Sequence, residues 1–239
     1  MKKLFLFLLA TVAAFNLLLA QKTINDPNAE KRNVNGFHGV HVSTGIKLIL
    51  TEGSTEDVAV SASKTEFRDK IITKVENGVL KIYYENKFEA IDRKKERKDL
   101  KAYVSYKSLD NLNANTGAQV QIEGTLKSSS LKMIANTGAI INGAINIDDF
   151  KVDQNTGSIV TLTGQAGKID VDGDTGSMFK GIDLKTDNCS AKVNTGAGIY
   201  ITVNKELNAK ANTGGYVKYK GDASIRELKT HTGGSISKI

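Results

Sequence analysis

Four carboxylates in the C-terminal half of the chain have the type and spacing to bind a cation or to act on a sugar. Asp170, Asp172 and Asp174 alternate along one segment, so an extended strand would carry all three on one face and Val171 on the other. Asp153 would join them if a repeat stacks it over Asp172. Carboxylate oxygens suit Ca²⁺, and retaining glycoside hydrolysis needs two carboxyl groups about 5 Å apart. The alternative is a solvated strand face rich in aspartate, and the sequence leaves both interpretations open.

A basic column recurs at a similar spacing. Lys192, Lys210 and Lys229 stand 18 and 19 residues apart. Like charges stacked at strand spacing repel one another, so this column either lies in solvent or meets an anionic partner. The sequence has no metal-ligand spacing, no phosphate-binding glycine loop and no nucleophile with a recognisable base. We therefore predict no catalytic residue, no cofactor and no firm metal site.

An apolar stripe is a further candidate for contact with a partner. Ile140, Ile159 and Met178 occupy equivalent positions of successive repeats. They form either an exposed stripe, typical of a subunit or partner contact, or part of the core if a bulge reverses their parity. The basic run from Arg93 to Lys98 is interpreted as a solvated loop. Cys189, the only cysteine, falls in an apolar column and is predicted to be buried rather than nucleophilic.

Repeated segments must position all of these residues. A tripeptide of Asn, Asp or His followed by Thr and Gly occurs seven times, with steps of 21, 19, 19, 20, 18 and 19 residues. A fixed period of this size indicates one supersecondary unit stacked on itself. The first residues of the tripeptides are Asn115, Asn136, Asn155, Asp174, Asn194, Asn212 and His231. Their glycines are Gly117, Gly138, Gly157, Gly176, Gly196, Gly214 and Gly233.

The pattern around each tripeptide predicts strands. On both sides of the tripeptide, every second residue is apolar. A period of two residues is typical of a strand with one buried face. A unit of roughly 19 residues is too short for a four-stranded propeller blade, but it fits one turn of a parallel β-solenoid with two or three short strands. We predict an all-β fold: a parallel β-helix of about seven rungs, preceded by an N-terminal β region.

The tripeptides are predicted to form the corners of this solenoid. Gly accepts a positive φ at a sharp bend, and Asn or Asp can bond nearby backbone and stack along the axis. Thr has the parity of the buried columns, so we expect its methyl group inside and its hydroxyl on the corner backbone. The residue after each glycine is small, as at Ala118, Ala139 and Ser158, which indicates a narrow interior there.

The N-terminal half divides into three segments. Residues 1–20 have two lysines and then an apolar run, the pattern of a secretory signal peptide; cleavage and retention as an anchor both stay open. Residues 21–35 contain the only proline and are expected to be a flexible leader. Residues 36–110 are predicted to form a β region that caps the repeats of residues 111–239, with a hairpin at Glu76-Asn77-Gly78.

The order of short motifs along the chain resembles a known family. Phe37 to Leu48 reads F-x-x-V-x-V-x-x-G-I-x-L, Val75 to Ile82 reads V-E-N-G-x-L-x-I, and Val104 to Leu109 reads V-x-Y-x-x-L before rungs of N-T-G-[AS]. This order is similar to the head GIN domain family, described as autotransporter adhesin heads, over roughly residues 36–239. The resemblance implies a right-handed parallel β-helix in an exported protein, common in Bacteroidetes-type bacteria, and it supplies no catalytic residues.

These features together predict an exported, non-catalytic module for adhesion or binding, in the periplasm, on the outer-membrane surface or outside the cell. The expected partner is a glycan or another envelope component, and self-association is open. A formal net charge of +7 is modest and mixed in sign, so it does not point to nucleic acid. No second segment is long and apolar enough to span a bilayer. The alternatives are a carbohydrate-active β-helix enzyme, using the four carboxylates, and a scaffold without a ligand.

Overall fold

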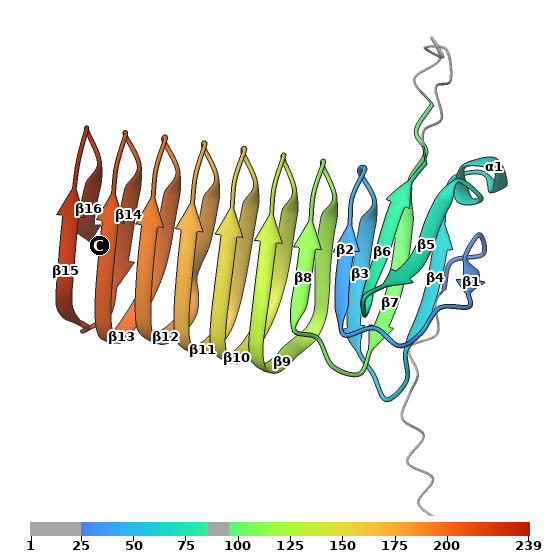
Figure 1. Cartoon of the computed structure of the whole chain (residues 1–239), viewed down its shortest axis with the longest axis horizontal. Coiled ribbons are helices and arrows are strands. Elements are labelled where there is room, and N and C mark those ends of the chain that lie inside the picture. Colours follow the sequence, from blue (N-terminus) through green and yellow to red (C-terminus); the bar gives the residue numbers. More distant parts are fainter. Residues whose placement is uncertain (1–24, 86–95) are drawn as a thin grey trace, which may run out of the picture.

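The computed structural model describes residues 25–85 and 96–239, which form one β-solenoid with a small antiparallel cap (Figure 1). The all-β fold and the solenoid of about seven turns are confirmed. In Figure 1 the chain climbs the near wall, turns at the upper edge, descends the far wall and advances by one rung, so the coil is right-handed. The predicted signal peptide, residues 1–20, and part of the basic run, Arg93 to Lys95, lie outside the described residues.

Two walls of parallel strands make up the solenoid. Five long strands pass through both walls: β9 (Gln119–Ala135), β10 (Ile140–Gln154), β11 (Ile159–Gly173), β12 (Met178–Val193) and β13 (Gly198–Ala211). The near wall of Figure 1 is completed by β2 (Gly39–Val42), β6 (Val79–Tyr84), β8 (Asn111–Ala114) and β15 (Ser224–Thr230). The far wall is completed by β3 (Lys47–Glu52), β7 (Lys101–Tyr106), β14 (Tyr216–Lys220) and β16 (Ser235–Lys238).

The rungs differ from the predicted two or three short strands. Each of β9 to β13 runs unbroken for 14 to 17 residues from one turn to the next, bending at the lower edge. Bulges near this bend absorb the uneven repeat length. The two-residue step from Asn142 to Ala144 in β10 faces the four-residue step from Gln121 to Thr125 in β9. These two additional residues explain why the first repeat step is 21 while the second is 19.

The seven tripeptides form tight turns at the upper edge. At each turn the threonine has φ between 46° and 51° and the glycine between 68° and 76°. The backbone N–H of the residue after the glycine donates to the carbonyl of the first residue at 2.8 to 3.3 Å. Two positive φ angles with this hydrogen bond are typical of a type I′ turn, which here takes the chain from the near wall to the far wall (Figure 1). In Asn115, Asn155 and Asp174 a side-chain oxygen also accepts from the next threonine N–H at 2.7 Å.

The expectation that these threonines point inward is wrong. Thr116, Thr156 and the five equivalent threonines are exposed, and the Thr116 hydroxyl donates to the preceding side chain, at 3.3 Å from Asn115 Oδ1, rather than to backbone. Alternation of inward and outward side chains holds only while the backbone is extended. At residues with positive φ the chain reverses, so the parity carried in from the strand no longer applies. The small residues after the glycines are buried from Ala118 to Gly215, as predicted.

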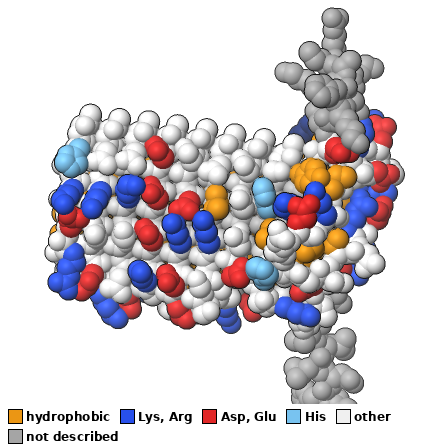
Figure 2. Space-filling model, in the orientation of Figure 1, with side chains coloured by type: hydrophobic (Ala, Val, Ile, Leu, Met, Phe, Trp, Pro, Cys, Tyr) orange, Lys and Arg blue, Asp and Glu red, His pale blue; other side chains and the backbone are white. Residues whose placement is uncertain are grey.

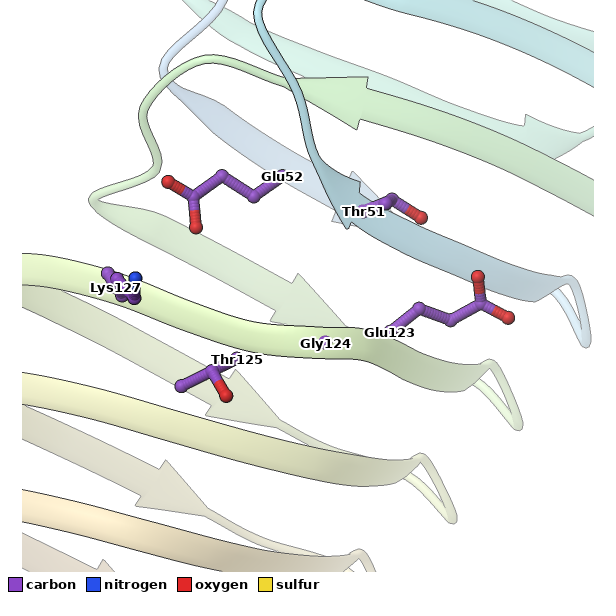
Figure 3. Close-up of a pocket in the computed structure, with 6 residues that line it drawn as sticks. All are labelled: Thr51, Glu52, Glu123, Gly124, Thr125 and Lys127. Carbon is purple, nitrogen blue, oxygen red and sulfur yellow. The ribbon is translucent and has the colours of Figure 1, made fainter. Parts of the chain in front are cut away.

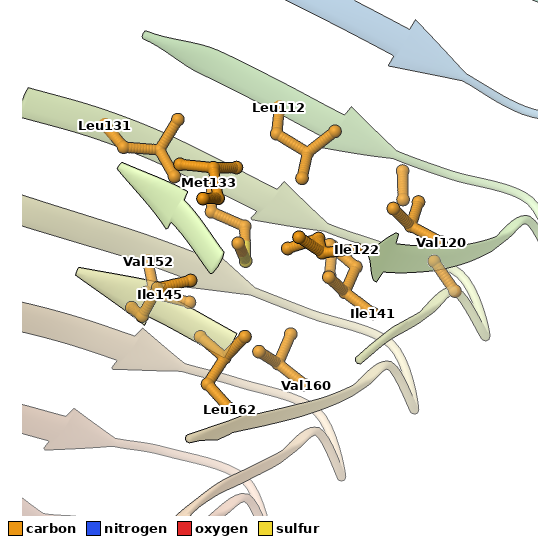
Figure 4. Packing of buried hydrophobic residues seen from close by; sticks show 14 of the residues in the cluster. Leu112, Val120, Ile122, Leu131, Met133, Ile141, Ile145, Val152, Val160 and Leu162 are labelled. Carbon is orange, nitrogen blue, oxygen red and sulfur yellow. The ribbon is translucent and has the colours of Figure 1, made fainter. Parts of the chain in front are cut away.

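Stacked apolar columns fill the space between the walls (Figure 4). Leu112, Met133 and Val152 form one column from the near wall, and Val120, Ile141 and Val160 face them from the far wall. All six are buried. Cys189 lies in the next near-wall column and is buried, as the sequence predicts. Period-2 alternation therefore produces one continuous core along the whole solenoid.

The N-terminal half contributes a rung as well as a cap. Strands β2 and β3 lie between β6 and β7 on one side and β8 and β9 on the other. Thr44 and Gly45, with φ angles of 62° and 71°, add an eighth member to the column of turns. The Gly45 N–H donates to the Thr116 carbonyl at 2.9 Å. The solenoid therefore begins well before residue 111, the boundary expected from the repeats.

Antiparallel strands and a short helix cover the N-terminal end of the solenoid. They are β1 (Glu30–Arg32), β4 (Asp57–Ser61), α1 (Thr65–Arg68) and β5 (Ile71–Glu76). β4 pairs with β7, and β5 joins β6 through the predicted hairpin, with positive φ at Asn77 and Gly78. The expected flexible leader is wrong for its described part, because β1 pairs with β4 and Asp26 accepts from the Tyr103 hydroxyl at 2.8 Å.

Candidate functional site

The four predicted carboxylates lie on the near wall but do not form a separate acidic site. Asp153 and Asp172 are stacked partners on β10 and β11, as the repeat predicts. Lys132 and Lys151 approach Asp153 at 3.6 and 3.7 Å, and Lys192 approaches Asp172 at 3.3 Å.

Asp174 has a different role, because its carboxylate accepts from the N–H and the hydroxyl of Thr175 at the turn. Within the described ranges, no three His, Cys, Asp or Glu side chains are arranged to hold a metal ion.

The predicted basic column continues this pattern of opposite charges. Lys192, Lys210 and Lys229 are stacked on β12, β13 and β15. Lys210 lies 3.1 Å from Glu227, and Lys229 contacts the same carboxylate. Hydrogen bonds from Lys229 and then Lys210 hold the pKa of Glu227 below its usual value. Figure 2 shows the result, a near wall on which both signs of charge are interspersed. Such exposed pairs contribute little energy each, and they mask the single-sign field that an anion or cation would need.

The apolar stripe faces outward on the far wall. Ile140, Ile159 and Met178 are paired in register, and Gly198 and Tyr216 continue the same column. The following residue in each rung is buried, whereas the stripe residues with side chains are half-buried. Of the two alternatives left open by the sequence, the structure shows the outward one.

At the end of this stripe, two tyrosines and their neighbours form what we call the tyrosine patch: Met178, Lys180, Tyr200, Tyr216 and Lys218. The rings of Tyr200 and Tyr216 meet edge to face, with centroids 5.8 Å apart and planes at 82°. The Lys218 Nζ lies 5.6 Å from the first centroid and 5.9 Å from the second. The Tyr216 hydroxyl lies 3.5 Å from the Met178 sulfur. The patch therefore combines apolar ring faces, hydroxyls and ammonium groups on one rigid wall.

Glycine at position 198 allows this arrangement. A Cβ there would lie only 2.5 Å from the Tyr216 ring, so the ring lies directly over the Gly198 backbone. Partial burial, and then the neighbouring Tyr200 hydroxyl, raises the pKa of the Tyr216 phenol. Sequence reasoning left the orientation of the Tyr216 column open and did not recognise the patch. The signal was present in the sequence. Lys180, Tyr200 and Lys218 form one column, which lies two residues after the column of Met178, Gly198 and Tyr216.

A recess of about 450 Å³ opens where β9 carries its two additional residues (Figure 3). Its lining is Thr51, Glu52, Glu123, Gly124, Thr125 and Lys127. In Figure 3 the Glu52 and Glu123 carboxylates point in different directions and do not converge on a common point. Hydrolysis of a glycosidic bond requires two carboxyl groups that flank one bond, so this recess lacks that arrangement. The sequence signal for it was the first repeat step of 21 residues.

Comparison with known families agrees with this geometry. The family model described as "Putative auto-transporter adhesin, head GIN domain" matches residues 36–223. The chain belongs to the head GIN domain family. No curated protein matches the chain. The resemblance found in the motifs is thus confirmed.

Solved structures share the fold of this head GIN domain. A "putative adhesin" from Bacteroides fragilis has a TM-score of 0.78 at 17% identity, covering 88% of this chain and 96% of its own. A "putative lipid binding protein" from Parabacteroides distasonis has a TM-score of 0.66 at 18% identity, covering 90% of this chain and 98% of its own. At these identities the likeness establishes the fold alone. The description of the family suggests an adhesion-like module of a surface or exported protein.

Among the described residues, no helix has both the length and the apolarity needed to span a bilayer.

Proposed function

We propose that this head GIN domain is an exported, non-catalytic adhesion module whose tyrosine patch binds acidic glycans. One observation carries the proposal: two tyrosine rings on adjacent rungs share one lysine ammonium on an outward wall. The electron-rich ring faces suit the C–H groups of a sugar ring. The ammonium groups of Lys180 and Lys218 supply donors for a sugar hydroxyl or carboxylate.

The setting of the patch favours binding. Tyr200 and Tyr216 stand on strands that are paired on both sides, so their backbone is held in place before a ligand arrives. A preorganised surface loses little conformational entropy on binding. The near wall is less suitable, because its lysines and aspartates already neutralise one another. A flat wall with an aromatic contact area is also what an adhesin needs for an extended polymer.

The test is a glycan array, followed by calorimetry with the best acidic oligosaccharide. Tyr216→Ala and Tyr200→Ala should each weaken binding at least about tenfold, equivalent to ~1.4 kcal/mol. Lys218→Gln should weaken binding of acidic glycans more than of neutral ones, and added salt should reduce that difference.

Tyr83→Ala is the matched control, because Tyr83 is also a half-buried outward tyrosine with a lysine, Lys74, over its ring at 5.7 Å. It lies on β6 near the cap and should leave glycan binding unchanged. Equal losses in Tyr83→Ala and Tyr216→Ala would contradict the assignment of the site. If no glycan on the array binds, the result supports a scaffold without a ligand. If a bound glycan is cleaved, the result supports the alternative of a carbohydrate-active enzyme.

A further inference from the structure

The C-terminal end of the solenoid differs from its N-terminal end in leaving core positions exposed. Ile225 and Leu228 of β15 occupy the columns of Leu207 and Ala209. Their exposed fractions are 44% and 42%, whereas Leu207 and Ala209 are fully buried. Ile239, beside β16, is 52% exposed. Ile225 and Leu228, whose column partners point inward, thus reach the surface because no described residue lies beyond them.

The backbone at this end is also unpaired on one side. β15 pairs with β13 and β16 pairs with β14, and no other described strand pairs with either. A free edge of this kind is a ready template for another strand. At the opposite end, β4 and β1 extend the far wall and β5 extends the near wall in antiparallel fashion. Within the described residues, the antiparallel strands therefore cover the core at the N-terminal end, whereas core side chains are exposed at the C-terminal end, which we call the open end.

We propose that the open end is an interface between two copies of this chain, joined end to end as a two-fold dimer. A molecule with a single open end cannot continue a head-to-tail filament, because its capped end offers no matching rung. Two open ends that meet use the same surface on both subunits, which is the closed, self-complementary contact of a two-fold dimer. The same contact buries Ile225 and Leu228 of both copies.

The charges on β15 fit an antiparallel pairing of this strand with itself. If Leu228 faces Leu228 of the partner subunit, then Glu227 faces Lys229 of the partner subunit, and the reverse holds across the axis. Directly opposed side chains in antiparallel strands lie about 5 Å apart, where opposite charges attract. Glu227 and Lys229 already share an ion pair within one copy, so the dimer would extend it into a four-membered network. In-register parallel pairing would instead oppose like charges.

One consequence rests on the proposed function. With β15 paired to β15, the far walls also join through β16, so the β14 strands of the two copies stand three strand spacings apart, about 14 Å. Both tyrosine patches then lie on one continuous wall. A single glycan chain could contact both patches, and the second contact would be intramolecular, which raises the overall affinity.

Sedimentation velocity and light scattering of the full chain, without glycan, test the dimer directly. We expect a species of twice the 25.8 kDa chain mass that dissociates on dilution. Leu228→Asp should abolish it, with circular dichroism as the check on folding. Lys229→Glu should weaken dimerisation at least tenfold, and the double variant Glu227→Lys/Lys229→Glu should restore it, because the swapped charges again face opposite ones.

Lys192→Glu is the control, because Lys192 occupies the same outward column in an internal rung. It should leave the dimer intact. A parent that stays monomeric at all concentrations would overturn the proposal, as would filaments, or a dimer that survives both Leu228→Asp and Lys229→Glu. A parent protein that binds glycan as a monomer would refute the dimer but not the proposed function. A dimer that binds no glycan would refute the proposed function but not the dimer.

Discussion

Replacing Gly164 by alanine should destabilise the solenoid far more than replacing Gly157, although both glycines have positive φ. Gly157 lies at the tip of a turn with φ of 68°, and an added Cβ would have no atom within 4 Å. Its cost is then the local backbone strain alone, roughly 1–2 kcal/mol. Gly164 lies at the lower bend of β11 with φ of 106°, where an added Cβ would lie 2.1 Å from the Ile145 carbonyl oxygen.

The Gly164 contact requires a backbone shift in addition to the local strain. The Ile145 carbonyl belongs to β10, which is paired on both sides, so moving it disturbs two ladders. Overpacking of this kind costs roughly 1–3 kcal/mol. Gly164→Ala should therefore lose roughly 2–5 kcal/mol, against roughly 1–2 kcal/mol for Gly157→Ala. For a chain of this size each kcal/mol corresponds to a shift of about 2–4 °C in Tm.

Urea denaturation followed by circular dichroism measures both changes. Thr163→Ala is the control, since Thr163 is exposed beside Gly164 and a surface change of this kind is usually within about 0.5 kcal/mol. Coincident transitions at two wavelengths would establish that a single free energy of unfolding applies. If Gly164→Ala cost no more than Gly157→Ala, the close approach of β10 and β11 at this bend would be refuted.

Two further predictions concern titratable groups. Burial, and to a lesser extent Asp170, raises the pKa of the Cys189 thiol. A disulfide reagent at pH 8 should therefore leave the folded protein unlabelled and should label the protein unfolded in urea. Rapid labelling of the folded protein would contradict this prediction. Burial, and then Lys81, lowers the pKa of His41 below 6.5. Below that pH the unfolded chain binds more protons than the folded protein, so the free energy of unfolding should fall as the pH is lowered. His41→Gln should lose less stability than the parent protein between pH 7.5 and pH 5. An equal loss in urea denaturation would refute the assignment.

The sequence predicted the solenoid because its determinants are local and periodic. Alternation identified the strands, and the tripeptide identified the turns, since two adjacent positive φ angles require residues that tolerate them. The constant period then gave the stacking partners, such as Asp153 with Asp172. The prediction that the turn threonines point inward failed, because the alternation of inward and outward side chains does not continue through a turn. The sequence interpretation also missed the rung formed by β2 and β3. The strands that pair with this rung are distant from it along the chain, so no repeat spacing indicates them.

The candidate sites required the tertiary structure for the same reason. Whether Lys192 and Asp172 form a charged site or a neutral pair depends on side chains from adjacent rungs, and the structure pairs them at 3.3 Å. The tyrosine patch depends on Gly198, which leaves room for the Tyr216 ring on the next rung.

By itself, the sequence determined the repeating backbone: strand, turn, column and core. Only the tertiary structure decided which outward side chains touch, and which end of the solenoid stays open. Period and parity follow from covalent geometry and burial along one strand. Contacts between outward side chains of different rungs, such as Tyr200 with Tyr216 or Lys192 with Asp172, join residues 16 to 20 positions apart that meet only when the rungs stack, and the covering of the ends joins more distant segments.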